Sequence, residues 1–151
     1  MKNVTAGIVS FNRADCLKRL TTSIREFKYA DMPILVADNS TTISHKTSAI
    51  VACMNNDHAE YCYIGEDAGI AKCRNWLINN CHTKYLLILE DDFVFTEKTK
   101  ISELLGTSEE FDCIAGGAVD NNGNLLHYEF IFELDTVQKG SVIFRQVMAI
   151  D

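Results

Sequence analysis

The amino-acid sequence predicts an α/β fold, in which helices flank a mostly parallel sheet and a β-rich extension follows at the C-terminal end. Three observations predict it. Short apolar runs alternate with segments of helical period, the chain contains a single proline, and 47% of its 151 residues are hydrophobic. A chain of this length and apolar content fits one domain with a genuine core, which we expect to span residues 1–151.

The first part of the chain predicts a strand, a helix and a second strand. Val4–Ser10 and Ile34–Ala37 are short apolar runs of the kind found in buried strands. Between them, Ala14–Tyr29 carries apolar side chains at three- and four-residue steps, namely Leu17, Leu20, Ile24 and Phe27. This spacing places them on one face of an amphipathic helix.

The next part of the chain predicts a second helix and a third strand. The helix is indicated by a short apolar group, Ile50, Val51 and Met54. Thr41–Lys46, ahead of this group, is polar and is expected to be a loop. Tyr61–Ile64 is the third strand candidate.

A third helix, a fourth strand and a fourth helix follow. The helix Ile70–Asn80 is expected to turn one side inward, formed by Ile70, Cys73, Trp76 and Leu77. Tyr85–Leu89 is a fully apolar strand candidate. Glu97–Leu105 fits a helix that ends at Gly106, because glycine is common just after the last helical residue.

The C-terminal part of the sequence is richer in β-type residues. Cys113–Ala118 is a fifth strand candidate, and Asp120–Asn124 has the composition of a turn. Leu126–Leu134 and Ser141–Val147 follow as two further β-rich runs. We expect these two runs to form a hairpin that extends the sheet.

Charge and cysteine content exclude several classes of function. The net charge of −7 argues against nucleic-acid binding, which needs a basic face, and an anionic ligand would need a cation or a local basic group. The six cysteines form no CxxC pair and no zinc spacing. No targeting segment or membrane span is recognisable, so we expect reduced thiols and a cytoplasmic location.

Polar residues follow each of the first four predicted strands. They are Ser10–Arg13, Asp38–Ser40, Gly65–Asp67 and Glu90–Asp92. Because the carboxyl ends of parallel strands meet at one edge of a sheet, and such sheets bind ligands beyond that edge, these residues are expected to converge on one site.

The acidic group at the end of the fourth strand is the strongest chemical signal. Glu90, Asp91 and Asp92 lie between two apolar patches, where mutual repulsion and partial burial disfavour their charged forms. A bound Mg²⁺ or Mn²⁺ would relieve the repulsion, since both ions prefer oxygen ligands. The alternative is an acidic turn that caps a helix beginning near Thr96.

Five further positions each have a functional and a structural interpretation. Gly69 could let the backbone approach a ligand and Arg74 could bind a phosphate, or the glycine only permits a turn and the arginine lies in solvent. Asp38 could hydrogen-bond a nucleobase or ribose, or form an Asx turn. Phe11 and Asn12 could contact a base, or belong to the end of the strand.

Four segments together resemble family 2-type GT-A glycosyltransferases, most closely the ganglioside β-1,4-N-acetylgalactosaminyltransferase group. The segments are Val4–Arg13, Asp38–Ser40, Gly69–Asn75 and Lys84–Phe95. The family's block of Thr-Lys-Tyr, an apolar run, three acids and Phe-Val-Phe matches Thr83–Phe95, so the acids stand at the family's DXD motif. The likeness spans nearly the whole chain and implies the Rossmann-like GT-A fold.

The resemblance implies how a nucleotide is held. Phe11, Asn12 and Asp38 would hold the uracil of a UDP-sugar, and Arg74 would lie near the ribose or the diphosphate. Glu90 stands where the family has an aspartate that contacts the ribose. The remaining members of the expected nucleotide-binding set are Arg13, Gly69 and Asp91.

The resemblance also implies the metal and the reaction. Asp92 would ligate Mn²⁺ or Mg²⁺, and the ion would bridge both phosphates and stabilise the charge that develops on UDP. The sugar would pass, with inversion, to a hydroxyl of a glycan or another acceptor, which requires a general base.

No residue of the sequence is identified as the general base. In the family the base and much of the acceptor site lie beyond the position of Asp151, so we expect a truncated or reduced acceptor half. The alternative function is a non-catalytic module that binds a nucleotide-sugar and a metal. A receiver-type signalling domain and a nucleotidyltransferase are disfavoured, because the first strand is followed by neither an acidic pair nor a Gly-rich basic loop.

Overall fold

The computed structural model describes residues 2–54, 57–106, 118–120 and 122–126. The chain divides into two compact units, Met1–Thr99 and Lys100–Asp151, and the single domain expected for 1–151 stays a prediction. The first unit contains β1 (Val4–Ser10), α1 (Ala14–Glu26), β2 (Ile34–Asp38), α2 (Ile43–Met54), β3 (Ala59–Tyr63), α3 (Ile70–Asn80) and β4 (Tyr85–Glu90). The second unit contains α4 (Ile101–Gly106), β5 (Ala118–Val119) and β6 (Leu125–Leu126).

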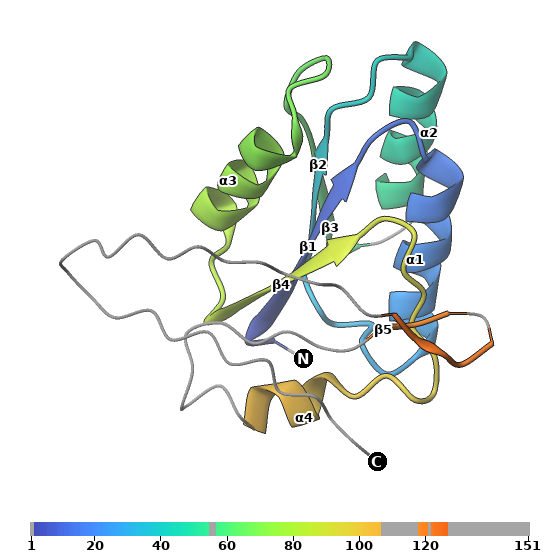
Figure 1. Ribbon diagram of the computed structural model, residues 1–151. Helices are drawn as coiled ribbons and strands as arrows, with labels where there is room; N and C mark the ends of the chain where they lie inside the picture. The colour runs from blue at the N-terminus through green and yellow to red at the C-terminus, as the bar shows by residue number, and fades with distance from the viewer. Residues whose placement is uncertain (1, 55–56, 107–117, 121, 127–151) are drawn as a thin grey trace, which may run out of the picture. The chain divides into compact units, whose positions relative to one another are not determined.

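The four strands of the first unit form one parallel sheet in the order β3-β2-β1-β4 (Figure 1). The chain builds outward from β1 through β2 to β3 and then places β4 on the other side of β1. The strand order therefore reverses between β1 and β4. In open parallel sheets, ligands bind beyond the carboxyl ends of the strands at such a reversal. The predicted α/β fold is confirmed for this unit.

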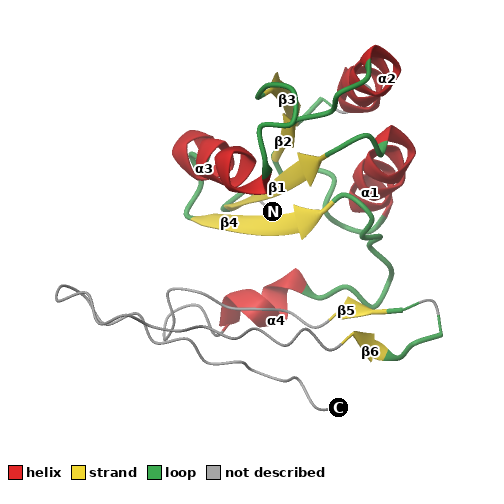
Figure 2. Ribbon diagram, turned by 45° about the horizontal axis from the view of Figure 1, so that its top comes forward, coloured by secondary structure: helices red, strands yellow, loops and turns green. Residues whose placement is uncertain are grey.

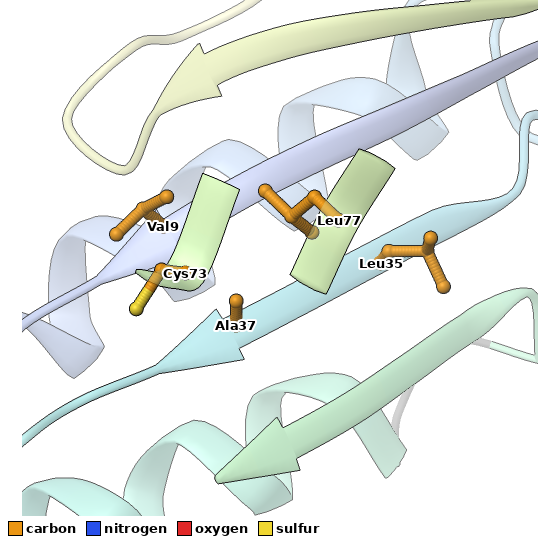
Figure 3. Close-up of a cluster of buried hydrophobic side chains, with 5 residues drawn as sticks. All are labelled: Val9, Leu35, Ala37, Cys73 and Leu77. Carbon is orange, nitrogen blue, oxygen red and sulfur yellow. The ribbon is translucent and has the colours of Figure 1, made fainter. Parts of the chain in front are cut away.

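Helices cover the two faces of this sheet, with α3 on one face and α1 and α2 on the other (Figure 2). Toward α3, the sheet contributes Val9, Leu35 and Ala37, which pack with Cys73 and Leu77 of the helix (Figure 3). Successive side chains of a strand point to opposite faces, and both faces are covered here. The sequences of these strands are therefore mostly continuous apolar runs.

Helix α1 ends at Glu26, three residues earlier than predicted. Lys28 adopts a left-handed conformation with φ of 68°, which stops the helix. Tyr29 then leaves the helical path and is buried. Its ring meets the edge of Phe95 at a centroid distance of 5.4 Å, and its hydroxyl donates to the Thr99 carbonyl oxygen at 2.9 Å.

Helix α2 begins at Ile43, so the loop expected over Thr41–Lys46 is wrong from Ile43 onward. The reason is a cap supplied from another part of the chain. The side-chain oxygen of Asn12 accepts the Thr41 N–H at 3.1 Å and lies 3.5 Å from the Thr42 nitrogen. Amides at the start of a helix lack partners within the helix, so this contact favours helix initiation here.

Other boundaries also differ from the prediction: β2, β4 and α4 each end one residue later than expected, and the differences at β3 and at the start of α4 are larger. β3 runs over Ala59–Tyr63 instead of Tyr61–Ile64, with Ala59 paired to Ile34 of β2. α4 begins at Ile101 instead of Glu97. Ahead of α4, the Thr96 N–H donates to the Thr99 hydroxyl at 3.0 Å and the Thr99 N–H to the Thr96 carbonyl at 3.1 Å, so this segment forms a turn.

The second unit is described in part. The strands predicted at Cys113–Ala118, Leu126–Leu134 and Ser141–Val147 lie outside the described residues, except for Ala118 in β5 and Leu126 in β6. The turn between β5 and β6 is confirmed, because the Asp120 carboxylate accepts the N–H groups of Asn122 and Asn124. Among the residues that the structure describes, no helix has the length and apolar content needed to cross a bilayer.

Candidate functional site

A cavity of about 250 Å³ lies in the first unit at the carboxyl ends of β1 and β4. It is lined by Val9, Phe11, Arg13, Asn39, Asp67, Gly69, Ile70 and Glu90. An aromatic ring, two aliphatic side chains, an amide, two carboxylates and a guanidinium therefore face one space. This mixture suits a ligand with a flat apolar part, hydroxyl groups and negative charge.

Four of the residues predicted for the site line this cavity: Phe11, Arg13, Gly69 and Glu90. The Phe11 side chain is 41% exposed, so part of its ring is accessible to a ligand. Gly69 has φ of 82°, a conformation that other residues adopt only with strain, and a Cβ atom there would point into open space. Its position fits both a turn and a close approach to a ligand.

Asp38 does not line the cavity but is completely buried beside it. One carboxylate oxygen accepts the Ser40 N–H at 2.8 Å and the Ser40 hydroxyl at 2.5 Å, and the other accepts the Tyr61 hydroxyl at 2.6 Å. Burial, and then this hydrogen bond to Asp38, raise the pKa of Tyr61. The carboxylate thus forms the Asx turn considered as its alternative role, and its contact with a nucleobase stays a prediction.

Asn12 likewise lies outside the cavity lining and connects two loops. It has φ of 55°, its backbone N–H donates to the Ser40 hydroxyl at 2.8 Å, and its side-chain nitrogen donates to the Thr41 hydroxyl at 2.9 Å. These contacts fix the loop after β1 against the loop after β2. A direct contact of Asn12 with uracil stays a prediction.

Four of the cavity residues were not individually assigned to the site from the sequence: Val9, Asn39, Asp67 and Ile70. With its amide oriented to satisfy its neighbours, Asn39 donates to the Ser10 carbonyl at 2.9 Å and accepts the Gly69 N–H at 3.3 Å. Asn39 and Asp67 were recognisable only as strand-end residues. Ile70 was expected to point inward, but it is 48% exposed and lines the cavity, so that expectation is wrong.

Arg74 does not line the cavity, but it pairs with Glu90, which does. Its guanidinium lies 2.8 Å from the carboxylate of Glu90, and Glu90 lines the cavity while Arg74 does not. The arginine therefore fixes the position of the carboxylate. The contacts of Arg74 with a phosphate and of Glu90 with a ribose stay predictions.

Asp91 and Asp92 share one arginine but differ in exposure. Arg13 Nη2 lies 2.7 Å from Asp91 Oδ1, an ion pair by distance whose atoms are not aligned for a hydrogen bond. Its Nη1 donates to Asp92 Oδ2 at 3.0 Å. The Asp91 side chain is fully buried and that of Asp92 is 48% exposed. Burial, opposed by the charge of Arg13, raises the pKa of Asp91 to about 6.

Asp91 and Asp92 offer the oxygen ligands that a hard cation prefers, and the cation expected from the acidic motif stays a prediction. Among the described residues, no three His, Cys, Asp or Glu side chains are grouped to hold a metal. Mg²⁺ is usually bound through one or two carboxylates, and water and substrate phosphates complete its coordination. Asp92 is accessible, and Asp91 places a second, poorly hydrogen-bonded carboxylate behind the same arginine. A site completed by a ligand's phosphates is compatible with this arrangement.

Buried thiols near the sheet are unsuited to nucleophilic chemistry. The five cysteines of the described ranges are free. Burial, and then the charge of Asp38, raise the pKa of Cys53 to about 12 and also raise that of Cys73. Both thiols therefore stay protonated at neutral pH, and the thiolate is the reactive form.

Comparison with known sequences identifies the family of the chain. The model of the family described as "Glycosyl transferase family 2" matches residues 5–144. Mouse beta-1,4 N-acetylgalactosaminyltransferase 2 is 32% identical over 144 residues, which cover 95% of this chain and 26% of the relative. Mouse beta-1,4 N-acetylgalactosaminyltransferase 1 is 30% identical over 146 residues, with the same two coverages. The chain thus spans about a quarter of the length of these relatives.

Comparison with solved structures supports the fold. The crystal structure of S. aureus TarS 1-349 matches with a TM-score of 0.57 at 14% identity and covers 72% of this chain and 33% of that chain. The structure of the same protein in complex with UDP-GlcNAc also matches with a TM-score of 0.57 at 14% identity, over 72% of this chain and 32% of that chain.

Proposed function

The chain belongs to glycosyl transferase family 2, and from this premise we propose that it binds a UDP-sugar in the cavity at the carboxyl ends of β1 and β4 and transfers the sugar to an acceptor hydroxyl. The observation that carries the proposal is the position of the cavity. It lies where the strand order reverses, Glu90 and Arg13 line it, and Arg13 pairs with Asp91 and Asp92, which lie outside the lining. Two of the structural neighbours are complexes with UDP and with UDP-GlcNAc, which supports this class of donor.

The apolar and carboxylate groups of the cavity suit the nucleoside part of such a donor. The partly exposed ring of Phe11 can stack on a pyrimidine, and Ile70 and Val9 offer further apolar surface. Glu90, fixed by Arg74, can accept hydrogen bonds from ribose hydroxyls. Asp38 and Asn12 then contribute by holding the loops that shape the cavity.

The charged groups suit the diphosphate. Arg13 lines the cavity and can donate to phosphate oxygens, and Asp92 is the carboxylate proposed to hold Mn²⁺ or Mg²⁺. Such an ion supplies positive charge that stabilises the leaving UDP. Inversion at the anomeric carbon follows only from the family resemblance, and the general base is not assigned.

Metal-dependent binding of UDP tests this proposal. We expect isothermal titration calorimetry to give binding in the presence of Mn²⁺ and a loss of at least tenfold in affinity when the metal is chelated. Asp92→Asn should remove the metal dependence, because a neutral amide is a poor ligand for a hard cation. Asp15→Asn, an exposed acid in the first turn of α1, is a matched control that should bind as the wild type does.

The catalytic part of the proposal needs a second measurement. Release of UDP from a panel of UDP-sugars, with and without hydroxyl acceptors, should show turnover that Asp92→Asn abolishes. Metal-dependent binding with neither hydrolysis nor transfer would instead indicate a module that binds nucleotide-sugars without catalysis. Binding that does not depend on metal or on Asp92 would contradict the proposed site.

A further inference from the structure

We propose that Arg13 changes one hydrogen-bond partner when the donor binds. Its Nη1 leaves Asp92, which becomes free to ligate the metal, and donates to the diphosphate instead. This inference rests on the proposed function and adds a change of ion-pair partner at that site. Its consequence is that metal and diphosphate bind cooperatively, because each one raises the affinity of the protein for the other.

The starting point is that one guanidinium spans two neighbouring acids. Arg13 Nη2 lies 2.7 Å from Asp91 and Nη1 lies 3.0 Å from Asp92. Arg13 follows β1 and immediately precedes α1, and it also lines the cavity, so the same side chain borders the acids and the ligand space. In the nucleotide-free protein, the carboxylate proposed to hold the metal is therefore already paired with a cation.

The two ion pairs of Arg13, with Asp91 and with Asp92, differ in how easily they break. Asp91 is fully buried, and removing the partner of a buried charge is strongly unfavourable. Asp92 is 48% exposed and Arg13 is 47% exposed, and ion pairs between accessible groups contribute little. The contact with Asp91 therefore anchors the arginine, while the contact with Asp92 is exchangeable.

The cooperativity follows from the charges. A metal arriving alone must displace Nη1 from Asp92, and a diphosphate arriving alone meets the negative charges of Glu90 and Asp92. When both arrive, Nη1 donates to a phosphate oxygen and Asp92 is free to ligate the ion. Such coupling is reciprocal, so the factor by which UDP tightens the metal equals the factor by which the metal tightens UDP.

Metal binding in the absence of catalysis tests this exchange. Free Mn²⁺ can be quantified by electron paramagnetic resonance during titration of the protein, with and without UDP. Without UDP, Arg13→Gln should bind Mn²⁺ about two- to fivefold more tightly than the wild type, the range expected for releasing an accessible ion pair. The factor by which UDP tightens Mn²⁺ should fall by about tenfold, because the charged donor to phosphate is gone.

Two further variants make the result specific. Arg19→Gln removes the same charge from an exposed site on α1 and should leave both the affinity and the coupling factor unchanged. Arg13→Lys keeps the charge but cannot bridge two carboxylates, so it should also lower the coupling factor. If circular dichroism shows that Arg13→Gln is unfolded, the coupling factor of Arg13→Lys tests the exchange.

The outcomes separate this inference from the proposed function. A wild-type protein that binds UDP without any need for metal would overturn both. Metal-dependent UDP binding with an unchanged coupling factor in the folded Arg13 variants would overturn only the exchange, even if Mn²⁺ bound more tightly. Weaker Mn²⁺ binding by Arg13→Gln in the absence of UDP would also overturn it.

Discussion

At the scale of single residues, adjacent acids of the same motif have different physical roles. Asp91 is buried against Arg13, while Asp92 is half exposed beside the same arginine. Both acids follow the end of β4 in a turn closed by the Phe93 N–H, which donates to the Glu90 carbonyl oxygen at 3.2 Å, and in this turn one acid faces the interior and the next faces outward. Asp91 therefore serves mainly to hold Arg13, and Asp92 is the one available to a ligand.

The burial of Asp91 predicts a specific dependence of stability on pH. Its pKa rises from 3.8 to about 6 on folding, so the folded protein holds a proton that the unfolded chain loses between these values. The free energy of unfolding should therefore decrease as pH rises from about 4 to about 6, by on the order of 2–3 kcal/mol from this group. Asp91→Asn should lack this decrease.

Denaturant unfolding at pH 4 and pH 7 can measure the effect. Titrations of the other carboxyl groups are common to both proteins, so the difference between wild type and Asp91→Asn isolates this one. Relative to the wild type, the variant should gain stability as pH rises through this window. Parallel pH profiles would show that Asp91 ionises normally in the folded protein.

At the scale of elements, the site depends on how closely α3 packs on the sheet. Gly7, in the middle of β1, lies under Leu77 of α3 and beside Leu86 of β4. The absence of a side chain at Gly7 lets the helix approach, and α3 begins at the cavity with Gly69 and Ile70. A residue buried in the sheet thus helps to set the position of cavity residues on the helix.

Gly7→Ala should destabilise the protein by about 1–3 kcal/mol, the cost typical of adding a methyl group to a packed core. The new Cβ would lie 2.8 Å from Leu86 Cδ1 and 3.3 Å from Leu77 Cδ1, so both side chains must move. Gly106→Ala is the matched control, because a Cβ there meets nothing within 4 Å. Equal unfolding free energies for the two variants, measured in urea, would contradict this packing argument.

At the scale of the whole molecule, the charge of the chain and the charge of its proposed ligand have the same sign. The chain carries a net charge of −7, and the acids Glu90, Asp91 and Asp92 are only partly balanced by Arg13 and Arg74. A diphosphate adds more negative charge at this place. Binding of the nucleotide should therefore stabilise the protein strongly only when a divalent cation accompanies it.

Thermal unfolding should show this linkage. At one hundred times the dissociation constant, UDP with Mn²⁺ should stabilise the protein by about 2.7 kcal/mol, which raises Tm by several degrees. UDP alone or Mn²⁺ alone should give a much smaller shift. Asp92→Asn should lose the combined effect while keeping its own Tm close to that of the wild type, since Asp92 is half exposed. Full stabilisation by UDP in the presence of a chelator would refute the linkage.

The order of residues along the chain was enough to predict the four strands of the first unit, their parallel arrangement and the edge of the sheet at which the cavity lies. β1 and α3 have the predicted limits, because apolar runs and helical periodicity are properties of neighbouring residues. The polar residues that follow the strands are recognisable for the same reason. Phe11, Arg13, Gly69 and Glu90 are predicted site residues of this local kind, and all four line the cavity.

The pairing of polar groups, in contrast, is set by the tertiary structure alone. Asn12 contacts Thr41 across 29 positions, Arg13 reaches Asp92 across 79, and Arg74 holds Glu90 across 16. Contacts of this kind leave no periodic signal, because they depend on how loops from different strands approach at the edge of the sheet. For the same physical reason, the sequence left two roles open for Asp38, and only the tertiary structure shows that it is buried and accepts hydrogen bonds from Ser40 and Tyr61.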